Sequence, residues 1–296
     1  MSLFPGFEQR KIRTSGATIN VVTGGEGPPL LLLHGYPQTH AMWHKVAPQL
    51  ARDYTVVCAD LRGYGESSKP RGVPGHLNYS KRAMAQDMAE VMEKLGYLRF
   101  HLVGHDRGGR VAHRLARDHG RRVATLTVLD ISPTLKMYQS TTMQFAKAYY
   151  HWFLLIQEAP LPEKMIAALG PGYILGRLGR GKEKLKHFDR RAVLEYVRAF
   201  RDPRTVHATC EDYRAAATID LVHDKQDLRR RLKMPVLALW GRQGVIQALF
   251  NCLADWREVA DDVRGRPLQC GHFIPEEKPK ELVAELQRFL GQHRLR

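Results

Sequence analysis

The chain has 296 residues, of which 44% are hydrophobic and 26% are charged. This length and composition suit one large α/β domain with an insertion, or two smaller domains. No apolar run is long enough to span a membrane, and the N-terminus lacks the pattern of a signal peptide. The four cysteines are far apart and form no C-x-x-C pair, which argues against a disulfide or metal site and favours a cytoplasmic location.

The formal net charge is +16, with 46 Lys and Arg residues against 30 Asp and Glu residues. Such a field attracts anions, whether nucleic acids, anionic membranes or small acidic substrates. The basic residues are dispersed, with modest clusters at residues 121–122 and 229–231, and no nucleic-acid-binding motif accompanies them. We therefore expect a solvated basic surface and no nucleic-acid or membrane partner.

Strands and helices alternate over the first part of the chain. Strands are expected at residues 7–13 and 17–22, joined by a hairpin turn at Ser15-Gly16, and then at 29–35, 55–60, 100–104 and 123–131. Helices are expected at 80–95 and 107–119. The alternation resumes with a strand at 235–241, a shorter strand before Cys270 and a last helix at 276–289.

Residues 132–233 interrupt this alternation. They are richer in aromatic, Arg and helix-forming residues, and several Pro and Gly residues break the segment. We expect a helical cap inserted after the sixth strand and folded over one edge of the sheet. Residues 1–131 and 234–296 would then form the α/β core, a mostly parallel eight-stranded sheet flanked by helices, with the ligand site at the carboxyl ends of the strands.

The segment Gly104-His-Asp106-Arg-Gly108 stands between a predicted strand and a predicted helix. It matches the G-x-S-x-G nucleophile elbow of α/β-hydrolases, with Asp106 in place of the serine. A carboxylate suits displacement at a saturated carbon that carries a leaving group, and the product is an ester of the enzyme that water must then open. The alternative is that Asp106 only caps the following helix.

Four further residues fit the roles that this chemistry needs. His272 follows the last strand, where the histidine base of an α/β-hydrolase stands in chain order. Many hydrolases carry the third acid after the strand that ends here at Gly241, but no carboxylate follows it closely. Asp130, at the end of the preceding strand, is the natural substitute. Two N–H groups, those of Tyr36 and Arg107, are predicted to form the oxyanion hole. The weaker rivals for the acid are Asp255, Asp261 and Asp262.

The sequence resembles the fluoroacetate (haloacetate) dehalogenases of the α/β-hydrolase superfamily over nearly its whole length. The motifs that carry the resemblance are His34-Gly-Tyr-Pro37, Gly104-His-Asp-Arg-Gly-Gly-Arg110, Leu129-Asp-Ile131, His151-Trp152 and Cys270-Gly-His-Phe273. The resemblance implies an Asp nucleophile, a His base and an acid after the sixth strand, which match Asp106, His272 and Asp130. It also implies a homodimer, with no metal or organic cofactor.

The same resemblance implies how the substrate is bound. Arg107 and Arg110 would hold the carboxylate of a small anionic haloacid, and His151, Trp152 and Tyr213 would bind the departing halide. Physical reasoning supports the arginine pair, because residues three apart on a helix share a face and two guanidinium forks can hold one carboxylate. For the aromatic residues the alternative is ordinary packing of the cap.

The sequence therefore predicts a hydrolase that removes halide from a short 2-haloacid such as fluoroacetate. One alternative is an epoxide hydrolase, which would use the same Asp, His and acid with tyrosines of the cap, for which Tyr149, Tyr150 and Tyr213 are available. The other is a non-catalytic ligand receptor with a hydrolase fold. A pair of charged arginines suits an anionic substrate better than a neutral epoxide.

Overall fold

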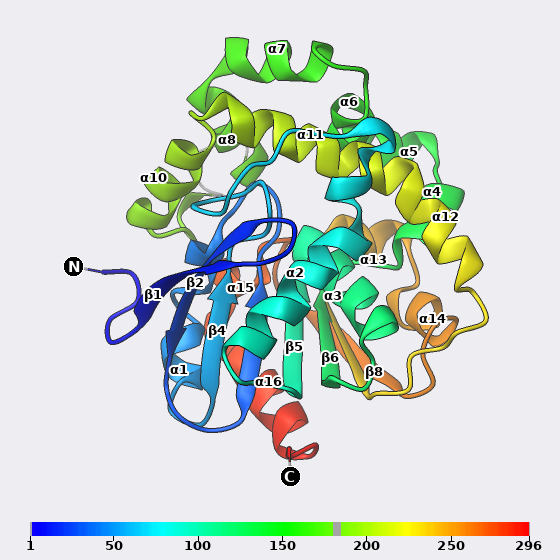
Figure 1. Ribbon diagram of the computed structural model, residues 1–296. Coiled ribbons are helices and arrows are strands. Elements are labelled where there is room, and N and C mark those ends of the chain that lie inside the picture. The colour runs from blue at the N-terminus through cyan, green and yellow to red at the C-terminus, as the bar shows by residue number, and fades with distance from the viewer. Residues whose placement is uncertain (1, 180–184, 296) are drawn as a thin grey trace.

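The computed structural model describes residues 2–179 and 185–295 of the chain (Figure 1). Within them, eight strands form one sheet in the order β1-β2-β4-β3-β5-β6-β7-β8. The strands are β1 (Glu8–Arg13), β2 (Thr18–Gly24), β3 (Pro29–Leu33), β4 (Thr55–Ala59), β5 (Phe100–His105), β6 (Val123–Leu129), β7 (Val236–Gly241) and β8 (Val263–Leu268). β1 and β2 form the predicted hairpin and pair antiparallel, β2 also pairs antiparallel with β4, and all other pairs are parallel. The predicted fold class is confirmed.

Burial explains why the central strands are almost wholly apolar. Every residue of β5, β6 and β7 is buried, as expected for parallel strands that helices cover on both faces. The two edge strands differ, because β1 is mostly exposed and β8 alternates between partly buried and exposed residues. Charged and polar side chains on β1, including Glu8 and Arg10, make it a poor template for pairing with another chain.

The core helices connect the strands and flank the sheet (Figure 1). They are α1 (Ala47–Leu50), α2 (Lys81–Lys94), α3 (Arg107–Asp118), α13 (Val245–Leu249), α14 (Cys252–Arg257), α15 (Ile274–Glu277) and α16 (Pro279–Gly291), with short 3₁₀ helices η1 (His40–Trp43) and η2 (Pro74–Tyr79). The single last helix that the sequence predicts at 276–289 is wrong, because α15 and α16 are separate. Lys278 between them has φ −135°, as expected before Pro279, whose ring disfavours helical backbone in the preceding residue.

The segment between β6 and β7 is helical where the structure describes it. Its helices are α4 (Thr134–Gln139), α5 (Met143–Ala148), α6 (Tyr150–Leu155), α7 (Leu161–Leu169), α8 (Pro171–Leu178), α10 (Arg190–Ala199), α11 (Pro203–Ala217) and α12 (Ile219–Gln226). Figure 1 shows these helices across the top of the molecule, over one end of the sheet. We call this segment the cap, and its division from the core at residues 132 and 233 stays a prediction.

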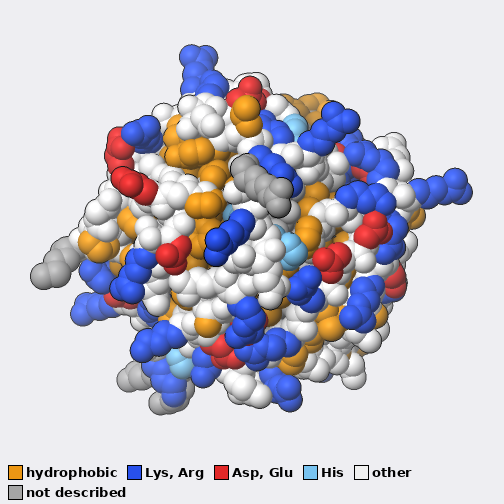
Figure 2. All heavy atoms as spheres, turned by 90° about the horizontal axis from the view of Figure 1, so that it is seen from below, with side chains coloured by type: hydrophobic (Ala, Val, Ile, Leu, Met, Phe, Trp, Pro, Cys, Tyr) orange, Lys and Arg blue, Asp and Glu red, His pale blue; other side chains and the backbone are white. Residues whose placement is uncertain are grey.

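The charge of the surface is mixed on the face opposite the cap. Figure 2, seen from below, shows many Lys and Arg side chains scattered among acidic and apolar groups. Several of the basic side chains are paired, such as Arg231 with Asp261 and Arg266 with Glu281. None of the helices in the part of the chain that the structure describes has the length and apolar character to cross a membrane.

The turn from β5 into α3 is packed tightly against β3. A Cβ atom on Gly108 would lie 2.4 Å from the carbonyl oxygen of His34 and 2.5 Å from that of Leu33. A Cβ atom on Gly104 would lie 2.4 Å from the carbonyl oxygen of Gly108. Because these neighbours are backbone atoms of a buried sheet, they cannot move aside as a flexible side chain would. The two glycines therefore allow α3 to start directly against the sheet.

We expect Gly108→Ala to lower the free energy of unfolding by about 1–3 kcal/mol, the usual cost of overpacking a core. Gly176→Ala is the matched control, since Gly176 is also helical and no atom lies within 4 Å of its added Cβ. That change should leave stability unaltered or raise it by up to about 1 kcal/mol, the gain in helix propensity. Urea unfolding of both variants tests this, and equal stabilities would contradict the packing argument.

Candidate active site

Asp106 occupies a strained corner between β5 and α3. Its backbone has φ 44° and ψ −113°, in a region that side chains other than glycine rarely adopt. The carboxylate makes no hydrogen bond with the first N–H groups of α3, so the alternative that Asp106 is a side-chain helix cap is wrong. Its Oδ2 instead accepts a hydrogen bond from the backbone N–H of Tyr36 at 3.0 Å. Tyr36 is one of the two predicted oxyanion donors.

His272 and Asp130 are joined by a short hydrogen bond. Nδ1 of His272 lies 2.6 Å from Oδ2 of Asp130, while Oδ1 of Asp130 accepts from the N–H of Gly241 at 2.8 Å. Asp130 thus lies where the sequence predicts the acid. Two of its rivals are paired on the surface, Asp261 with Arg231 and Asp262 with Arg264. The bond to Asp130 places the proton on Nδ1 and leaves Nε2 of His272 as the free base.

The pKa values of this group follow from its buried charges. Burial lowers the pKa of His272, but the hydrogen bond and charge of Asp130, together with the charge of Asp106, outweigh it and raise that pKa. Burial raises the pKa of Asp106, but nearby positive groups, led by His272 and Arg110, lower it overall. Asp106 is therefore ionised at neutral pH, as a nucleophile must be. Among the described residues, no group of His, Cys, Asp or Glu side chains could hold a metal ion.

The arginine pair lies beside Asp106, but neither guanidinium fork is free. Arg107 donates from Nε and Nη2 to the carboxylate of Asp212, at 2.9 Å and 2.7 Å. Arg110 donates from Nη1 to Ser132 O and Thr134 Oγ1. Only Arg107 Nη1 and Arg110 Nε lack a hydrogen-bond partner among the described residues, and both are buried. The protein thus already uses most of the donors of both arginines, and their binding of a substrate carboxylate stays a prediction.

Asp212 is the residue of this network that sequence reasoning missed. It is fully buried on α11 and accepts hydrogen bonds from Arg107, from Lys81 Nζ and, at 2.7 Å, from the hydroxyl of Tyr64. These charges hold its pKa well below the usual range despite its burial. Its position next to Tyr213 in the sequence could have indicated Asp212 as a site residue, but an acidic residue on a helix more often faces solvent.

The three aromatic residues proposed for halide lie together above the arginines. His151 and Trp152 come from α6, and Tyr213 comes from α11. The ring of Tyr213 lies 5.9 Å from that of His151 and 6.3 Å from that of Trp152, between centroids. Cζ of Arg107 lies 4.1 Å from the Tyr213 centroid, and Cζ of Arg110 lies 4.6 Å from the Trp152 centroid. Each arginine is thus stacked against one aromatic ring of the cap.

Two of these aromatic residues carry buried polar atoms without a partner. Nδ1 of His151 and the hydroxyl of Tyr213 make no hydrogen bond with any described residue. Arg107 Nη1 and Arg110 Nε are two more such atoms, although buried polar groups in proteins are normally satisfied. All four can donate a hydrogen bond. Their concentration around Asp106 is the chemistry of a site that binds an anion.

A cavity of about 660 Å³ opens from the site between cap and core. His272 and Tyr149 line it, and its cationic side chains are Lys147, Arg177 and Lys186. The acid Glu277, which also lines it, is bonded to the backbone N–H groups of Gly271 and Phe273. The guanidinium group of Arg177 along this entrance favours the approach of a small anion.

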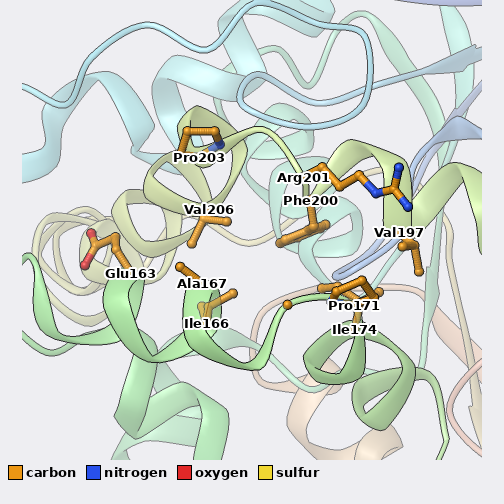
Figure 3. A pocket seen from close by; sticks show the side chains of 11 residues that line it. Glu163, Ile166, Ala167, Pro171, Ile174, Val197, Phe200, Arg201, Pro203 and Val206 are labelled. Carbon is orange, nitrogen blue, oxygen red and sulfur yellow. The ribbon is translucent and has the colours of Figure 1, made fainter.

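A second cavity, of about 280 Å³, lies within the cap among α7, α8, α10 and α11 (Figure 3). Apolar side chains such as Ile166, Ile174 and Phe200 surround it. Among the described residues that line it, the only carboxylate is that of Glu163, which is paired with Arg214. Neither Asp106 nor His272 lines this cavity, whereas His272 lines the cavity described above.

Comparison with known proteins places the chain in a family. The family model of the alpha/beta hydrolase fold matches residues 28–279. A fluoroacetate dehalogenase of a Burkholderia species is 48% identical over 99% of this chain and 96% of its own. A soluble epoxide hydrolase of Corynebacterium sp. (strain C12) is 34% identical over 94% of this chain and 95% of its own.

Solved structures agree with this placement. An α/β-hydrolase from Nostoc sp PCC 7120 shares 56% sequence identity and superposes with a TM-score of 0.93, over 96% of this chain and 97% of that one. The resemblance that the short sequence motifs predict is therefore confirmed. The chain belongs to the fluoroacetate dehalogenase family of the α/β-hydrolase superfamily.

Proposed function

We propose that the protein hydrolyses the carbon–halogen bond of a short 2-haloacid such as fluoroacetate, releasing halide and, from fluoroacetate, glycolate. The observation that carries this proposal is an ionised carboxylate, Asp106, beside two buried arginine N–H groups that have no partner among the described residues. The 48% identity to a fluoroacetate dehalogenase supports it. The homodimer and the cytoplasmic location stay predictions.

In the first step, the substrate carboxylate binds to Arg107 Nη1 and Arg110 Nε. This holds the substrate's C2 carbon close to Asp106, and the two cations offset the repulsion between the two carboxylates. Oδ2 of Asp106 is bonded to Tyr36 N–H, so Oδ1 attacks C2. The C–O bond forms as the carbon–halogen bond breaks, and the bonding electrons leave with the halide.

The leaving halide needs hydrogen-bond donors that are already in place, and fluoride needs them most because its charge is concentrated on a small atom. His151, Trp152 and Tyr213 supply one N–H or O–H each. The unpartnered hydroxyl of Tyr213 and the unpartnered Nδ1 of His151 support this role. Because these donors are fixed before the reaction, little reorganisation accompanies the departure of the ion.

In the second step, water opens the ester. Nε2 of His272 takes a proton from the water while Asp130 holds the ring in position, and the water oxygen attacks Cγ of Asp106. The N–H groups of Tyr36 and Arg107 stabilise the oxyanion. When the intermediate collapses, the Cγ–O bond to the substrate breaks and the leaving alkoxide takes the proton from His272. Asp106 is restored with one oxygen atom from water.

An epoxide hydrolase is the second candidate, because a relative with that name is 34% identical. Tyr213 is buried and Tyr149 is half-buried, and the charge of nearby Asp106 contributes to raising the pKa of each hydroxyl. The partnerless N–H groups of Arg107 and Arg110 favour the haloacid, because a neutral epoxide would leave them unpaired.

Trapping the ester tests the proposed function. We expect His272→Ala to release about one equivalent of fluoride from fluoroacetate and then stop, because a general base contributes roughly 10²–10⁴-fold to hydrolysis. Mass spectrometry should find Asp106 carrying a carboxymethyl group. In the unaltered enzyme, one turnover in heavy-oxygen water should place the label in Asp106. Asp106→Asn is the control and should release no fluoride; first-turnover label found only in glycolate would exclude the mechanism.

The raised pKa of His272 predicts a pH dependence. The base must be neutral, so ester hydrolysis is lost as the pH falls through that raised pKa. Asp130→Asn removes the hydrogen-bonded charge that raises the pKa. The acidic limb of ester hydrolysis should therefore move to lower pH, while the maximal rate falls by roughly 10²–10⁴-fold. Single-turnover rates across the pH range measure both effects, and an acidic limb that stays in place or moves upward would contradict the assignment.

The arginine contacts predict unequal effects of two substitutions. Arg110→Gln should slow chloroacetate turnover by about 10- to 150-fold, the value of one charge-assisted hydrogen bond, and affect neutral chloroacetamide much less. Arg107→Gln should in addition lower stability by about 3–5 kcal/mol, because it leaves the buried charge of Asp212 without its main partner. Arg121→Gln, on the exposed surface, controls for net charge. Equal losses on both chloro compounds would mean that Arg110 is structural.

A further inference from the structure

The ring of His151 is held in a fixed plane. It stacks on the ring of Tyr36, with centroids 5.8 Å apart and planes 12° apart. The rings of Tyr149 and Tyr213 contact it edge-on, at 5.4 Å and 5.9 Å. The side chain is buried, with 5% exposed. Its orientation is therefore set by packing, and the position of its proton is the freedom that remains.

Arg177 of α8 decides that position. Its Nη2 lies 3.4 Å from Nε2 of His151. A guanidinium group has donors and no acceptor, so Nε2 must accept and the proton of a neutral ring must lie on Nδ1. This is the same Nδ1 that has no hydrogen-bond partner among the described residues. Arg177 thus leaves His151 with one N–H group that is directed away from Arg177 and is unused.

The tautomer matters because His151 is neutral. Burial, followed by the charges of Arg177, His272 and Arg107, holds the pKa of His151 well below its usual value. A neutral imidazole has one N–H donor, whereas an imidazolium has two. If the proton lay on Nε2, the ring would present a lone pair at Nδ1, and a halide ion there would be repelled.

We propose that Arg177 is a positioning residue that holds His151 in its Nδ1–H tautomer and thereby makes it a hydrogen-bond donor to the leaving halide. The identity of the anion rests on the proposed function, whereas the tautomer does not. Arg177 is itself held against the ring of Tyr150, with 5.5 Å from Cζ to the centroid, and lines the cavity that leads to His272. It acts through His151, and among the described residues no hydrogen bond or ion pair joins it to Asp106.

The tautomer can be read directly in solution. In protein labelled with ¹⁵N in its histidine rings, the signals that His151→Asn removes belong to His151. At neutral pH these should be those of a protonated Nδ1 and an unprotonated Nε2. Arg177→Met, which removes the donor and keeps an unbranched side chain, should shift the signals toward the Nε2–H form. Arg177→Lys should restore them, since an ammonium group also donates without accepting. Arg201→Met, on the exposed surface of the cap, is the control and should change nothing.

The kinetic effect of Arg177→Met should be confined to the step that breaks the carbon–halogen bond. Complete loss of one hydrogen-bond donor to a developing anion slows catalysis by about 10²–10³-fold. In a mixture of tautomers, part of the protein keeps the donor, so the decrease in rate is smaller. We expect Arg177→Met to slow single-turnover fluoride release by about 10-fold with little change in KM. The effect on bromide release from bromoacetate should be distinctly smaller, because bromide needs less help to leave. Arg177→Lys should recover most of the fluoride release.

Three results would overturn the proposal. They are an Nε2–H tautomer in the unaltered protein, signals of His151 that do not change in Arg177→Met, and a raised KM in Arg177→Met with an unchanged fluoride-release step. The last would make Arg177 a docking point for the incoming carboxylate. Failure of the proposed function itself would look different, since the unaltered protein would then release no halide while its His151 signals still showed the Nδ1–H form.

Discussion

The buried ion pair between Arg107 and Asp212 joins the core to the cap. Both side chains are inaccessible to solvent, and Asp212 also accepts hydrogen bonds from Lys81 and Tyr64. A buried charge that loses its partner costs several kcal/mol, so α11 cannot leave α3 without a large penalty. Tyr213 follows Asp212 in the chain, and the pair therefore also fixes the ring of Tyr213 against Arg107. The position of the Tyr213 ring beside Arg107 thus depends on this ion pair.

Because of this ion pair, Arg107 and Arg110 have different electrostatic surroundings. Arg107 is already neutralised by Asp212, whereas Arg110 donates only to uncharged acceptors of the protein. Burial lowers the pKa of Arg110, and the charge of Asp106 only partly offsets this. A cation in this position gains most from an anionic ligand, because the ligand supplies the missing counter-charge. Selectivity for a carboxylate would thus reside mainly in Arg110, and rigidity mainly in Arg107.

Local sequence patterns predicted the residues that stand at the ends of strands. Asp106 and Asp130 follow the buried strands β5 and β6, and His272 follows the edge strand β8. Parallel strands bring their carboxyl ends to one edge of the sheet. The sheet topology thus brings Asp130 and His272 to the same edge, where their side chains are hydrogen-bonded. Asp212 and Arg177 lie on cap helices, whose packing no periodicity in the sequence specifies. An acid or an arginine on such a helix looks like a solvated residue until the neighbouring helix is in place.

The sequence also could not show how many N–H groups of Arg107 and Arg110 are hydrogen-bonded within the protein. The spacing of Arg107 and Arg110 predicts a shared face. Their hydrogen-bond partners, however, are Asp212, 105 residues from Arg107, and Ser132 and Thr134, 22 and 24 residues from Arg110. Only the folded arrangement shows that one N–H nitrogen remains on each arginine. The sequence predicts that both guanidinium groups hold the substrate carboxylate. In the structure, one nitrogen of each group has no partner among the described residues, and the hydrogen bonds of the other nitrogens fix its direction.

The two candidate reactions would place different demands on the tyrosines near Asp106. Opening an epoxide requires a tyrosine to give up its proton to the alkoxide that forms, whereas a departing halide needs only a hydrogen bond. Burial and the nearby acids raise the pKa values of Tyr149 and Tyr213 well above the usual range, which makes proton transfer from either hydroxyl harder. Donating a hydrogen bond requires no ionisation, so the same burial does not oppose it. The electrostatics of the site thus suit these hydroxyls to stabilising a leaving anion more than to protonating one.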